Sequence, residues 1–318
     1  MQELIRQLGI KQHDFVNLEA GKVVSFNIAE NNDKELAVGA IIYVPALPTE
    51  IIEYVKNKNM ASVDADVISQ HAIPAHAEPE TFKGINFEGE QNEAVKFLAA
   101  KPGNLFNLST QELQALQVIS PTQIHLASQI YNKILWHRFH AYLNNGLKGI
   151  ATYDRGAGKE ADPGEELLTA TKNDKKLAHH FPDLYTVWLN YPAPLPPGAN
   201  EQFFLVNRQV EGRPTAVLMH RVILNLASGG IILSRQFYVG HSYNSSQLSI
   251  ECLPYRNGSL LISMSRTFTD QVTGFGSSLK RVVGRGQKHR KMVGYLRNLS
   301  DNLKKSGSLN CLDYHSKC

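Results

Sequence analysis

Five apolar runs separated by short turns constrain the fold of this chain more than any other feature of its sequence. Each run is rich in β-branched and aromatic residues, and the junctions contain turn-forming residues such as Glu211-Gly212, Ser228-Gly229-Gly230 and Asn257-Gly258. Strands joined by such short turns pair antiparallel, so we expect an up-and-down meander with Asn257-Gly258 as a two-residue type I′ turn. The runs are 202–210, 215–224, 231–240, 247–253 and 259–267.

A long amphipathic helix is predicted after the meander. Beyond Gly274 and Gly276, apolar residues recur at helical spacing, and the positions expected to face the sheet are Leu279, Val283, Val293 and Leu296. We expect Gly286 to let a strand or a ligand approach this helix closely, because glycine has no side chain to block it. The tail, 306–318, lacks apolar periodicity and is expected to be loosely ordered.

The N-terminal part predicts a hairpin, a helix and a third strand. Asn31-Asn32-Asp33 is a turn-forming cluster between two β-rich runs, and Pro48 suits the start of a helix. The predicted segments are 22–28 and 35–44 for the hairpin, 49–56 for the helix and 65–72 for the strand.

The middle of the chain has apolar residues at intervals of three and four, which predicts helices. The expected segments are helices at 91–100, 110–118 and 121–143, a polar loop at 154–165, and a helix at 166–188 with a break at Pro182. The stripe expected to be buried in the longest helix is Ile124, Ile130, Ile134, Leu135, Phe139 and Leu143.

We expect three regions. The sheet and the terminal helix come from 1–90 and 201–305, while 91–200 forms a helical insertion or lid and 306–318 is a tail. The insertion is expected to pack as a lid or side layer rather than as an independent domain, through Ile130, Ile134, Trp136 and Phe139.

This order of elements resembles the START-like, or helix-grip, superfamily. The segment Val38 to Val55, in which a strand ends at Pro45 and a helix opens with Pro48-Thr49-Glu50, is similar to the start of many such domains. The resemblance implies an α+β fold in which a curved antiparallel sheet wraps around a long C-terminal helix and leaves an apolar cavity, here with a helical insertion. Members include lipid and sterol carriers, cyclases and hydroxylase subunits, so the resemblance implies no single activity.

Two shorter motifs resemble those of a group of uncharacterised bacterial proteins. They are Gln236-Phe237-Tyr238-Val239-Gly240-His241-Ser242-Tyr243 and Gly276-Ser277-Ser278-Leu279-Lys280-Arg281. This second resemblance implies no role for the chain.

The charge of the chain is mildly basic. The formal net charge is +4 with a pI near 8.8, less than a dedicated nucleic-acid binder usually carries, so a nucleic-acid partner is not expected. Cationic residues are concentrated in the terminal helix. An anionic membrane surface is therefore a candidate partner, through Lys280, Arg281, Arg285 and Lys288.

Cysteine usage and hydropathy point to a protein of a reducing compartment. Cys252, Cys311 and Cys318 form no C-x-x-C pair and suggest neither a disulfide framework nor a zinc knuckle. No apolar run approaches the length of a bilayer span, and the N-terminus lacks the apolar stretch of a signal peptide. We expect a cytoplasmic protein, or a periplasmic or secreted one if the chain is a trimmed mature form.

Three sequence patterns resemble functional motifs but lack residues that those motifs require. The segment Gly240-His241-Ser242-Tyr243-Asn244 lacks the closing glycine of a nucleophile elbow, and Gly156-Ala157-Gly158-Lys159 lacks both the first glycine and the Ser/Thr of a phosphate-binding loop. His137 and His140 lie three apart, but neither H-E-x-x-H nor a paired E-x-x-H accompanies them. We therefore expect no metal ion and no cofactor.

The most suggestive polar residues lie on or near the meander. Strict alternation places Arg235, Phe237, Val239 and His241 on one face of their strand, and Gln236 and Tyr238 on the other. His220 lies in an apolar row, so it either points into a cavity or is a core histidine with a structural partner. The candidate ligand-binding residues are His220, Arg235, Tyr238, His241, Tyr243, Arg266 and Gly286.

Three functions remain open. The first is the binding of an apolar or amphipathic, lipid-like molecule between the sheet and the terminal helix. The second is an enzyme in the same cavity, with His241 or His220 as acid or base and Tyr238 or Arg266 polarising a carbonyl. The third is a structural or interaction protein with a filled core.

Overall fold

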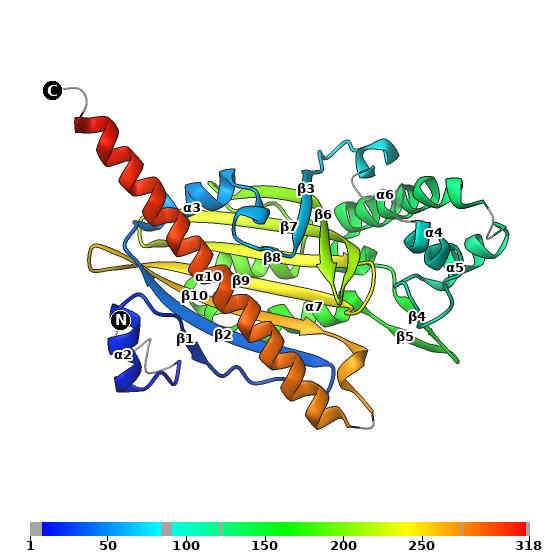
Figure 1. The fold of residues 1–318 in the computed structure, drawn as a ribbon, viewed down its shortest axis with the longest axis horizontal. Helices are drawn as coiled ribbons and strands as arrows, with labels where there is room; N and C mark the ends of the chain where they lie inside the picture. Colours follow the sequence, from blue (N-terminus) through cyan, green and yellow to red (C-terminus); the bar gives the residue numbers. More distant parts are fainter. Residues whose placement is uncertain (1–7, 84–90, 121–122, 275, 316–318) are drawn as a thin grey trace.

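An antiparallel sheet of eight strands is the frame of the protein (Figure 1). The structure is a computed structural model that describes residues 8–83, 91–120, 123–274 and 276–315. The strands follow the order β1-β2-β10-β9-β8-β7-β6-β3, and every neighbouring pair is antiparallel. They are β1 (Val24–Phe26), β2 (Glu35–Val44), β3 (Val67–Ala72), β6 (Asn200–Val210), β7 (Arg213–Leu226), β8 (Gly229–Val239), β9 (Ser245–Tyr255) and β10 (Gly258–Phe268).

The five-stranded meander predicted from the turns is confirmed, and one of its turns is shifted. Glu211 and Gly212 both have positive φ, 52° and 75°, as a type I′ turn requires. Between β9 and β10 the turn is Arg256-Asn257, with φ of 53° at Arg256, so the predicted Asn257-Gly258 turn is wrong by one residue. Gly258 instead begins β10, where a Cβ atom would collide with the carbonyl of Val44.

Most predicted helices are present, with two corrections in the helical region. Residues 154–165 are not a loop throughout, because β4 (Tyr153–Gly156) and β5 (Lys159–Ala161) form a small hairpin. The helix expected at 166–188 is three helices, because the Asp174 carboxylate accepts a hydrogen bond from the Leu177 N–H and caps a new start. The helices are α2 (Gln12–Glu19), α3 (Pro48–Asn57), α4 (Gln91–Leu98), α5 (Thr110–Gln117), α6 (Ala127–Asn145), α7 (Pro163–Lys172), α8 (Lys175–His180), α9 (Pro182–Leu189) and α10 (Ser277–His315).

Helices cover both faces of the sheet. Figure 1 shows α10 crossing the front of the sheet diagonally with α3 nearby, and α7 behind it. We call the α10 side the inner face, where Ile42, Ile250 and Leu261 pack on α3 and α10, and the opposite side the outer face, which α6 to α9 cover. The predicted α+β class, an antiparallel sheet with a long C-terminal helix and a helical insertion, is confirmed. None of the described helices combines the length and apolar character that crossing a membrane requires.

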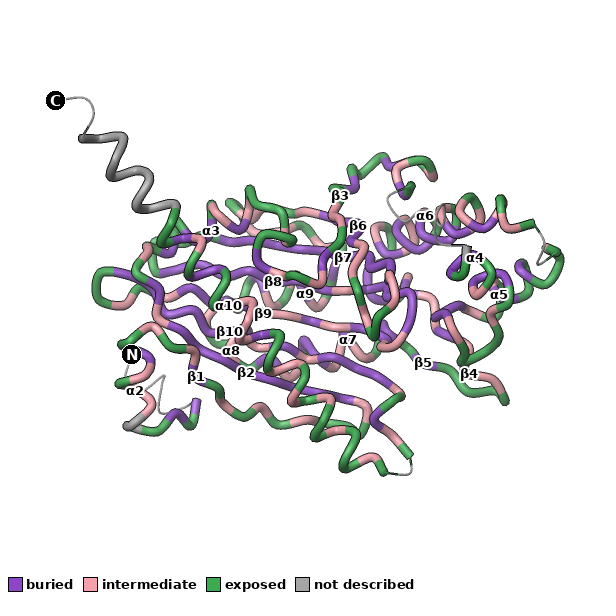
Figure 2. The backbone as a smooth tube through the Cα atoms, in the orientation of Figure 1, coloured by how far each residue is buried: buried purple, intermediate pink, exposed green. Residues whose placement is uncertain are grey.

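The middle of α10, from Gly284 to Leu303, is packed on the sheet. Met292, Leu296 and Leu299 are buried against the inner face, together with Leu303, whereas the first turns of α10 are mostly exposed (Figure 2). Leu296 therefore faces the sheet as predicted. The expectation for Leu279 and Val283 is wrong, because their side chains are 71% and 50% exposed where α10 overhangs the edge of the sheet.

The close approach predicted at Gly286 occurs two residues earlier, at Gly284. A Cβ atom on Gly284 would lie 2.9 Å from Leu36 Cδ1, whereas one on Gly286 would meet only the flexible guanidinium of Arg290, at 3.8 Å. The prediction for Gly286 is therefore wrong. Gly284 is the residue that brings α10 close to β2, because a side chain there would push the two elements apart.

The helical insertion packs on the outer face and uses tyrosines where aliphatic residues were expected. In α6 the fully buried residues include Tyr131 and Tyr142, while the predicted Ile130 and Leu143 are only partly buried. Ile134, Leu135 and Phe139 are buried as predicted. The buried stripe is therefore rotated by about one residue. These side chains share a core with residues of β6 to β8, namely Phe203, Leu205, Ala216, Leu218, Phe237 and Tyr238.

We expect replacement of Leu296 by alanine to destabilise the protein, because the side chain is fully buried and its removal leaves a cavity. The free energy of unfolding, measured by urea denaturation, should fall by about 2–5 kcal/mol. The matched control is Leu279→Ala on the exposed half of the same helix, which should change stability by less than about 0.5 kcal/mol. Equal effects of the two substitutions would contradict the anchoring of α10 on the sheet through Leu296.

Candidate functional site

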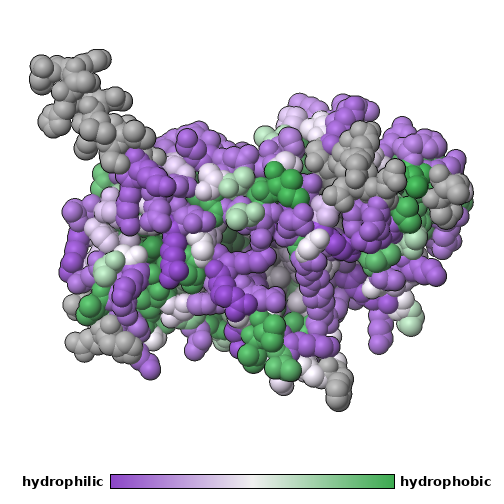
Figure 3. Space-filling view, viewed as in Figure 1, coloured by the Kyte–Doolittle hydropathy of each residue, from purple (hydrophilic) through white to green (hydrophobic). Residues whose placement is uncertain are grey.

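A small cavity of about 50 Å³ lies between the inner face, α3 and α10. Figure 3 shows this face of the molecule hollowed beside α10. We call this cavity the inner groove. It is lined by Val55, Met60, Met219, Arg221, Ile232, Ser234, Gln236, Ser246, Leu248, Ile250 and Tyr295.

The inner groove changes from apolar to polar along the strands. On β8 the inner-face residues run from Ile232 through Ser234 to Gln236, and on β9 they run from Ile250 through Leu248 to Ser246. On β10, in register, Leu261 is followed by Ser263, Ser265 and Thr267. One end of the groove, beside α3, is therefore aliphatic. The other, beneath the first half of α10, is rich in hydroxyl and amide groups.

Lys288 of α10 points into this polar end. Its ammonium group donates hydrogen bonds to Thr267 Oγ1 and, at 3.2 Å, to Ser265 Oγ. Thr267 Oγ1 lies 2.6 Å from Ser246 Oγ, so a chain of hydroxyls connects Lys288 to the lining of the groove. Among the described residues no carboxylate lies within ion-pair distance of this ammonium group.

The surroundings of Lys288 disfavour its charge. Burial lowers the pKa of Lys288 to about 7, and the positive charges of Arg208 and Lys291 act in the same direction. Glu35 raises this pKa but only in part, because its carboxylate pairs with Arg266. Arg208 is itself paired with Asp64, at 3.0 Å. A cation thus occupies the groove with neutral hydrogen-bond partners.

The predicted site residues are divided between the two faces. Tyr243 lies at the polar end of the inner groove, where its hydroxyl donates to Gln236 Oε1 at 2.6 Å. Arg235, His220 and Tyr238 point to the outer face, away from α10. Strict alternation fails after Gln236 because of an irregularity in the pairing of β7 and β8, which turns both Phe237 and Tyr238 toward the outer core.

Arg235 and His220 belong to a closed network beneath the helical insertion. Arg235 donates to the Tyr142 hydroxyl at 3.1 Å and to the Trp188 carbonyl at 2.9 Å, and its guanidinium lies 4.1 Å from the Trp188 ring centre. His220 Nδ1 lies 2.8 Å from the same Tyr142 hydroxyl. His220 Nε2 is 3.0 Å from Glu201, out of alignment for a hydrogen bond. Burial lowers the pKa of His220 to about 4, so the ring is neutral and structural in its contacts.

Tyr238 and His241 occupy two further buried networks. The Tyr238 hydroxyl lies 3.1 Å from that of Tyr131, and the guanidinium of Arg138 lies 4.6 Å from the Tyr238 ring centre. His241 Nε2 is 2.6 Å from Thr215 Oγ1, and burial, the largest cause, lowers the pKa of His241 to about 4. The residues considered for acid–base chemistry therefore do not converge on one point.

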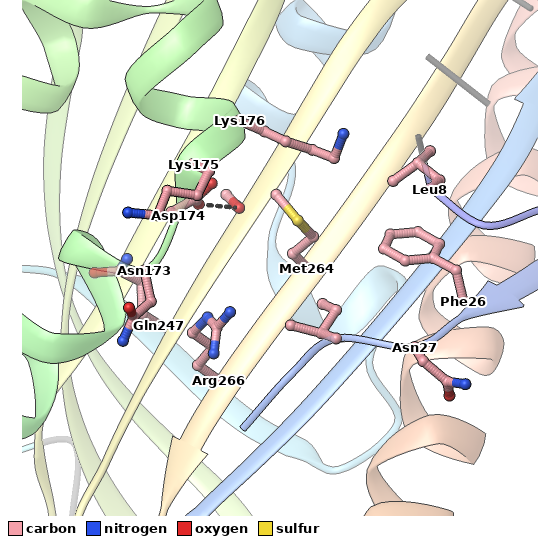
Figure 4. Close-up of a pocket in the computed structure, with 12 residues that line it drawn as sticks. Leu8, Phe26, Asn27, Asn173, Asp174, Lys175, Lys176, Gln247, Met264 and Arg266 are labelled. Carbon is pink, nitrogen blue, oxygen red and sulfur yellow. Dashed lines mark hydrogen bonds between the residues drawn. The ribbon is translucent and has the colours of Figure 1, made fainter. Parts of the chain in front are cut away.

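A larger cavity, of about 180 Å³, opens on the outer face (Figure 4). Arg266 lines it, and this is the one predicted ligand-binding residue found there. We call this cavity the outer pocket. It is lined by Leu8, Phe26, Asn27, Ile28, Asn173, Asp174, Lys175, Lys176, Gln247, Ser249, Met264 and Arg266.

Several lining residues of the inner groove were not anticipated from the sequence. Ser246, Arg221 and Tyr295 were not considered. Lys288, which reaches this lining through Thr267, was considered only as a contact for a membrane. One signal was present in β10, where the hydroxyl residues Ser263, Ser265 and Thr267 occupy every second position. Without the position of the helix that covers it, a row of polar residues on a strand predicts a face exposed to solvent.

Comparisons with known proteins add little to this site. No family model matches the sequence, and no curated protein matches it either. The crystal structure of Ara h 8.0201 is similar with a TM-score of 0.20 and 10% identity, over 44% of this chain and 89% of that one. The di-domain ARO/CYC StfQ from the steffimycin biosynthetic pathway is similar with a TM-score of 0.29 and 11% identity, over 85% of this chain and 99% of that one. At these TM-scores neither similarity supports an argument about function, and the fold is assigned from the strand order and α10.

The lowered pKa of Lys288 predicts a pH-dependent contribution to stability. An unfolded lysine has a pKa of about 10.4. Between pH 7 and that value the unfolded chain binds more protons than the folded one, so the free energy of unfolding rises with pH. Below pH 7 both states are protonated, and the cost of the buried charge is fully present.

We therefore expect Lys288→Met to gain stability relative to the wild type at pH 6.5 and to lose this advantage at pH 9.5. Urea denaturation at each pH value measures the free energy of unfolding of both proteins, and the difference between them should change with pH. Lys280→Met is the matched control, because Lys280 is exposed on the same helix and its removal should give the same difference at both pH values. If the free energies of unfolding of the wild type and Lys288→Met changed with pH in the same way, Lys288 would not be desolvated in the folded protein.

Proposed function

We propose that this protein binds an amphipathic, lipid-like molecule in the inner groove. The observation that carries the proposal is the change of lining from Ile232 and Ile250 at one end to Gln236 and Ser246 at the other. The ammonium group of Lys288 adjoins the polar end, because Thr267 Oγ1 is bonded to both Lys288 and Ser246. An apolar tail placed along the aliphatic end would be removed from water. A polar head group at the other end would meet hydrogen-bond donors.

Lys288 supports an anionic head group. Its present partners are neutral hydroxyls, and burial disfavours its charge, so a carboxylate within hydrogen-bond distance would stabilise the charged form. Arg221 adds a second cation to the lining, and its guanidinium donates to Gln202 Oε1 at 3.0 Å rather than to a carboxylate. The charge of the groove is thus complementary to an acid.

Binding of a chain requires the inner groove to widen, since about 50 Å³ holds only a few water molecules. The arrangement of α10 favours such widening. Buried apolar residues hold α10 from Met292 to Leu303, whereas Arg281 and Arg285, nearer its start, are held by the carboxylate of Glu30. Gly284 and Gly286 lie on either side of Arg285 and before Met292, and glycine weakens a helix by about 0.5–1 kcal/mol relative to alanine.

The alternative of catalysis by His220 or His241 has less support. Each imidazole is enclosed in its own network, and neither lines the inner groove or the outer pocket. A substrate carbonyl would have to displace Tyr142 or Thr215 to reach them. Ligand binding needs no such rearrangement of the outer core.

The test compares an acid with its alcohol. Dodecanoate and dodecanol are titrated by calorimetry at pH 6.5, where Lys288 is protonated, into the wild type, Lys288→Met and the control Lys280→Met. We expect the wild type and the control to bind the acid at least about tenfold more tightly than the alcohol, the size of one charge-assisted hydrogen bond, and Lys288→Met to lose this preference. Absence of binding by both compounds would contradict the proposed function. If all three proteins bound dodecanoate with the same affinity, only the role of Lys288 would be contradicted.

The proposal extends to contact with an anionic membrane. Of the four basic residues suggested for such a contact, Lys288 faces the sheet, and Arg281 and Arg285 pair with Glu30. Lys280 is exposed beside apolar side chains that are also exposed in the first turns of α10 (Figure 3). These are Leu279, Val282 and Val283. Basic and apolar side chains together suit the surface of an anionic bilayer.

Vesicle co-sedimentation tests this contact. We expect binding to vesicles that contain phosphatidylserine, weaker binding to pure phosphatidylcholine, and a decrease on raising salt, because surface charge attraction is screened. Lys280→Glu and Val282→Ser should each reduce binding, whereas Lys172→Glu, an exposed change on α7, should not. Equal sedimentation of all these proteins would contradict a contact through α10.

A further inference from the structure

The outer pocket is separated from the inner groove by the sheet itself. Consecutive residues of β9 show the separation, because Ser246 lines the groove and Gln247 lines the pocket. The pocket lies between the start of α8, the strands β9 and β10, Leu8, and the end of β1 with the two residues that follow it. It is therefore a candidate for a second ligand, independent of the proposed function.

One side of the outer pocket is apolar. Phe26 and Leu8 form the wall on the side of the N-terminal segment, Ile28 lies beside them, and Met264 of β10 forms the floor (Figure 4). At about 180 Å³ the volume is similar to that of cavities of roughly 150 Å³ that bind a benzene ring in other proteins. A single ring or a short branched chain fits this space, and a long acyl chain does not.

The other side is cationic. Figure 4 shows the side chain of Lys176 reaching across the pocket from α8, with Arg266 below it on β10. Lys175 and Lys176 form no ion pair with a carboxylate in the part of the chain that the structure describes, although the charge of Lys176 acts on the nearby Glu251. Their ammonium groups are available to an anion.

The acidic and amide groups of the outer pocket have other roles. Asp174 accepts hydrogen bonds from the Leu177 N–H and from Ser249 Oγ, at 3.0 and 2.9 Å. Gln247 Oε1 accepts from Thr171 and from Trp188. The hydrogen bonds that the guanidinium group of Arg266 forms within the described residues both use Nη1, toward Glu35 and Ala29. Nε and Nη2 of Arg266 remain as donors beside the two lysines.

We propose that the outer pocket binds a small organic anion, consisting of one ring or short apolar group and one acidic group. The apolar part rests on Phe26 and Met264, and the acidic group lies between Lys176 and Arg266, with Lys175 beside it. The class follows from three cationic side chains opposite an apolar wall in a space of one ring. Hydrogen bonds from cations to an anion are among the strongest that a site can offer.

Fluorine NMR of the full chain tests the proposal. The probe is 4-fluorobenzoate, and 4-fluorobenzyl alcohol of similar size is the neutral comparison. We expect saturable binding of the acid in the millimolar range or tighter, and weaker binding of the alcohol. The double variant Lys175→Gln/Lys176→Gln should bind the acid at least about tenfold more weakly, the loss that corresponds to about 1.4 kcal/mol. Met264→Trp should fill the floor and abolish binding.

Two control variants separate this site from others. Lys172→Gln removes an exposed lysine of neighbouring α7, and Lys288→Met alters the inner groove, so both should bind 4-fluorobenzoate as the wild type does. The lysine variants change side chains at the surface, and their thermal unfolding confirms that they are folded. The proposal is overturned if the acid shows no saturable binding, if the alcohol binds equally well, or if the double lysine variant binds the acid unchanged.

Discussion

Burial of one antiparallel sheet on both faces is the constraint on which the rest of the structure depends. In strands β7 to β9 almost every residue is shielded from water, on the inner side by α3 and α10 and on the outer side by the helical insertion. A polar side chain in such a position must find a partner or destabilise the fold. Arg235 meets this requirement through Tyr142, Thr171 and Trp188, with only its Nε lacking a partner. The positions of the buried charges thus follow from the layering.

The same layering explains what the sequence could predict. Turn residues and β-rich runs give the number and antiparallel order of the five meander strands, and these were predicted correctly from local patterns such as Glu211-Gly212. The face of the sheet toward which each side chain points was predicted less well. A single irregularity opposite Leu218 and Met219 turns Tyr238 to the side of Phe237, and no local residue pattern marks its position.

The candidate site depends on distances that a sequence does not contain. Helical periodicity shows that Val282 and Leu296 lie on the same face of α10, but it does not show where the sheet ends beneath that helix, so it does not predict that Val282 is exposed and Leu296 buried. In the same way, the alternation of Ser263, Ser265 and Thr267 identifies a polar row on β10, and only the position of Lys288 above it makes that row part of an enclosed site. Which polar residues become functional is decided by tertiary contacts.

The pairing of β3 with β6 has a consequence for how the chain folds. These two strands are neighbours in the sheet, yet the whole helical insertion lies between them in the sequence. Closing a flexible loop of that length costs conformational entropy before the stabilising strand contacts can form, and contacts between distant residues slow folding. Helices that form early within the insertion would bring its two ends closer together. The meander from β6 to β10 contains only neighbouring contacts, so it is the natural nucleus, and β3 would be among the last strands to join it.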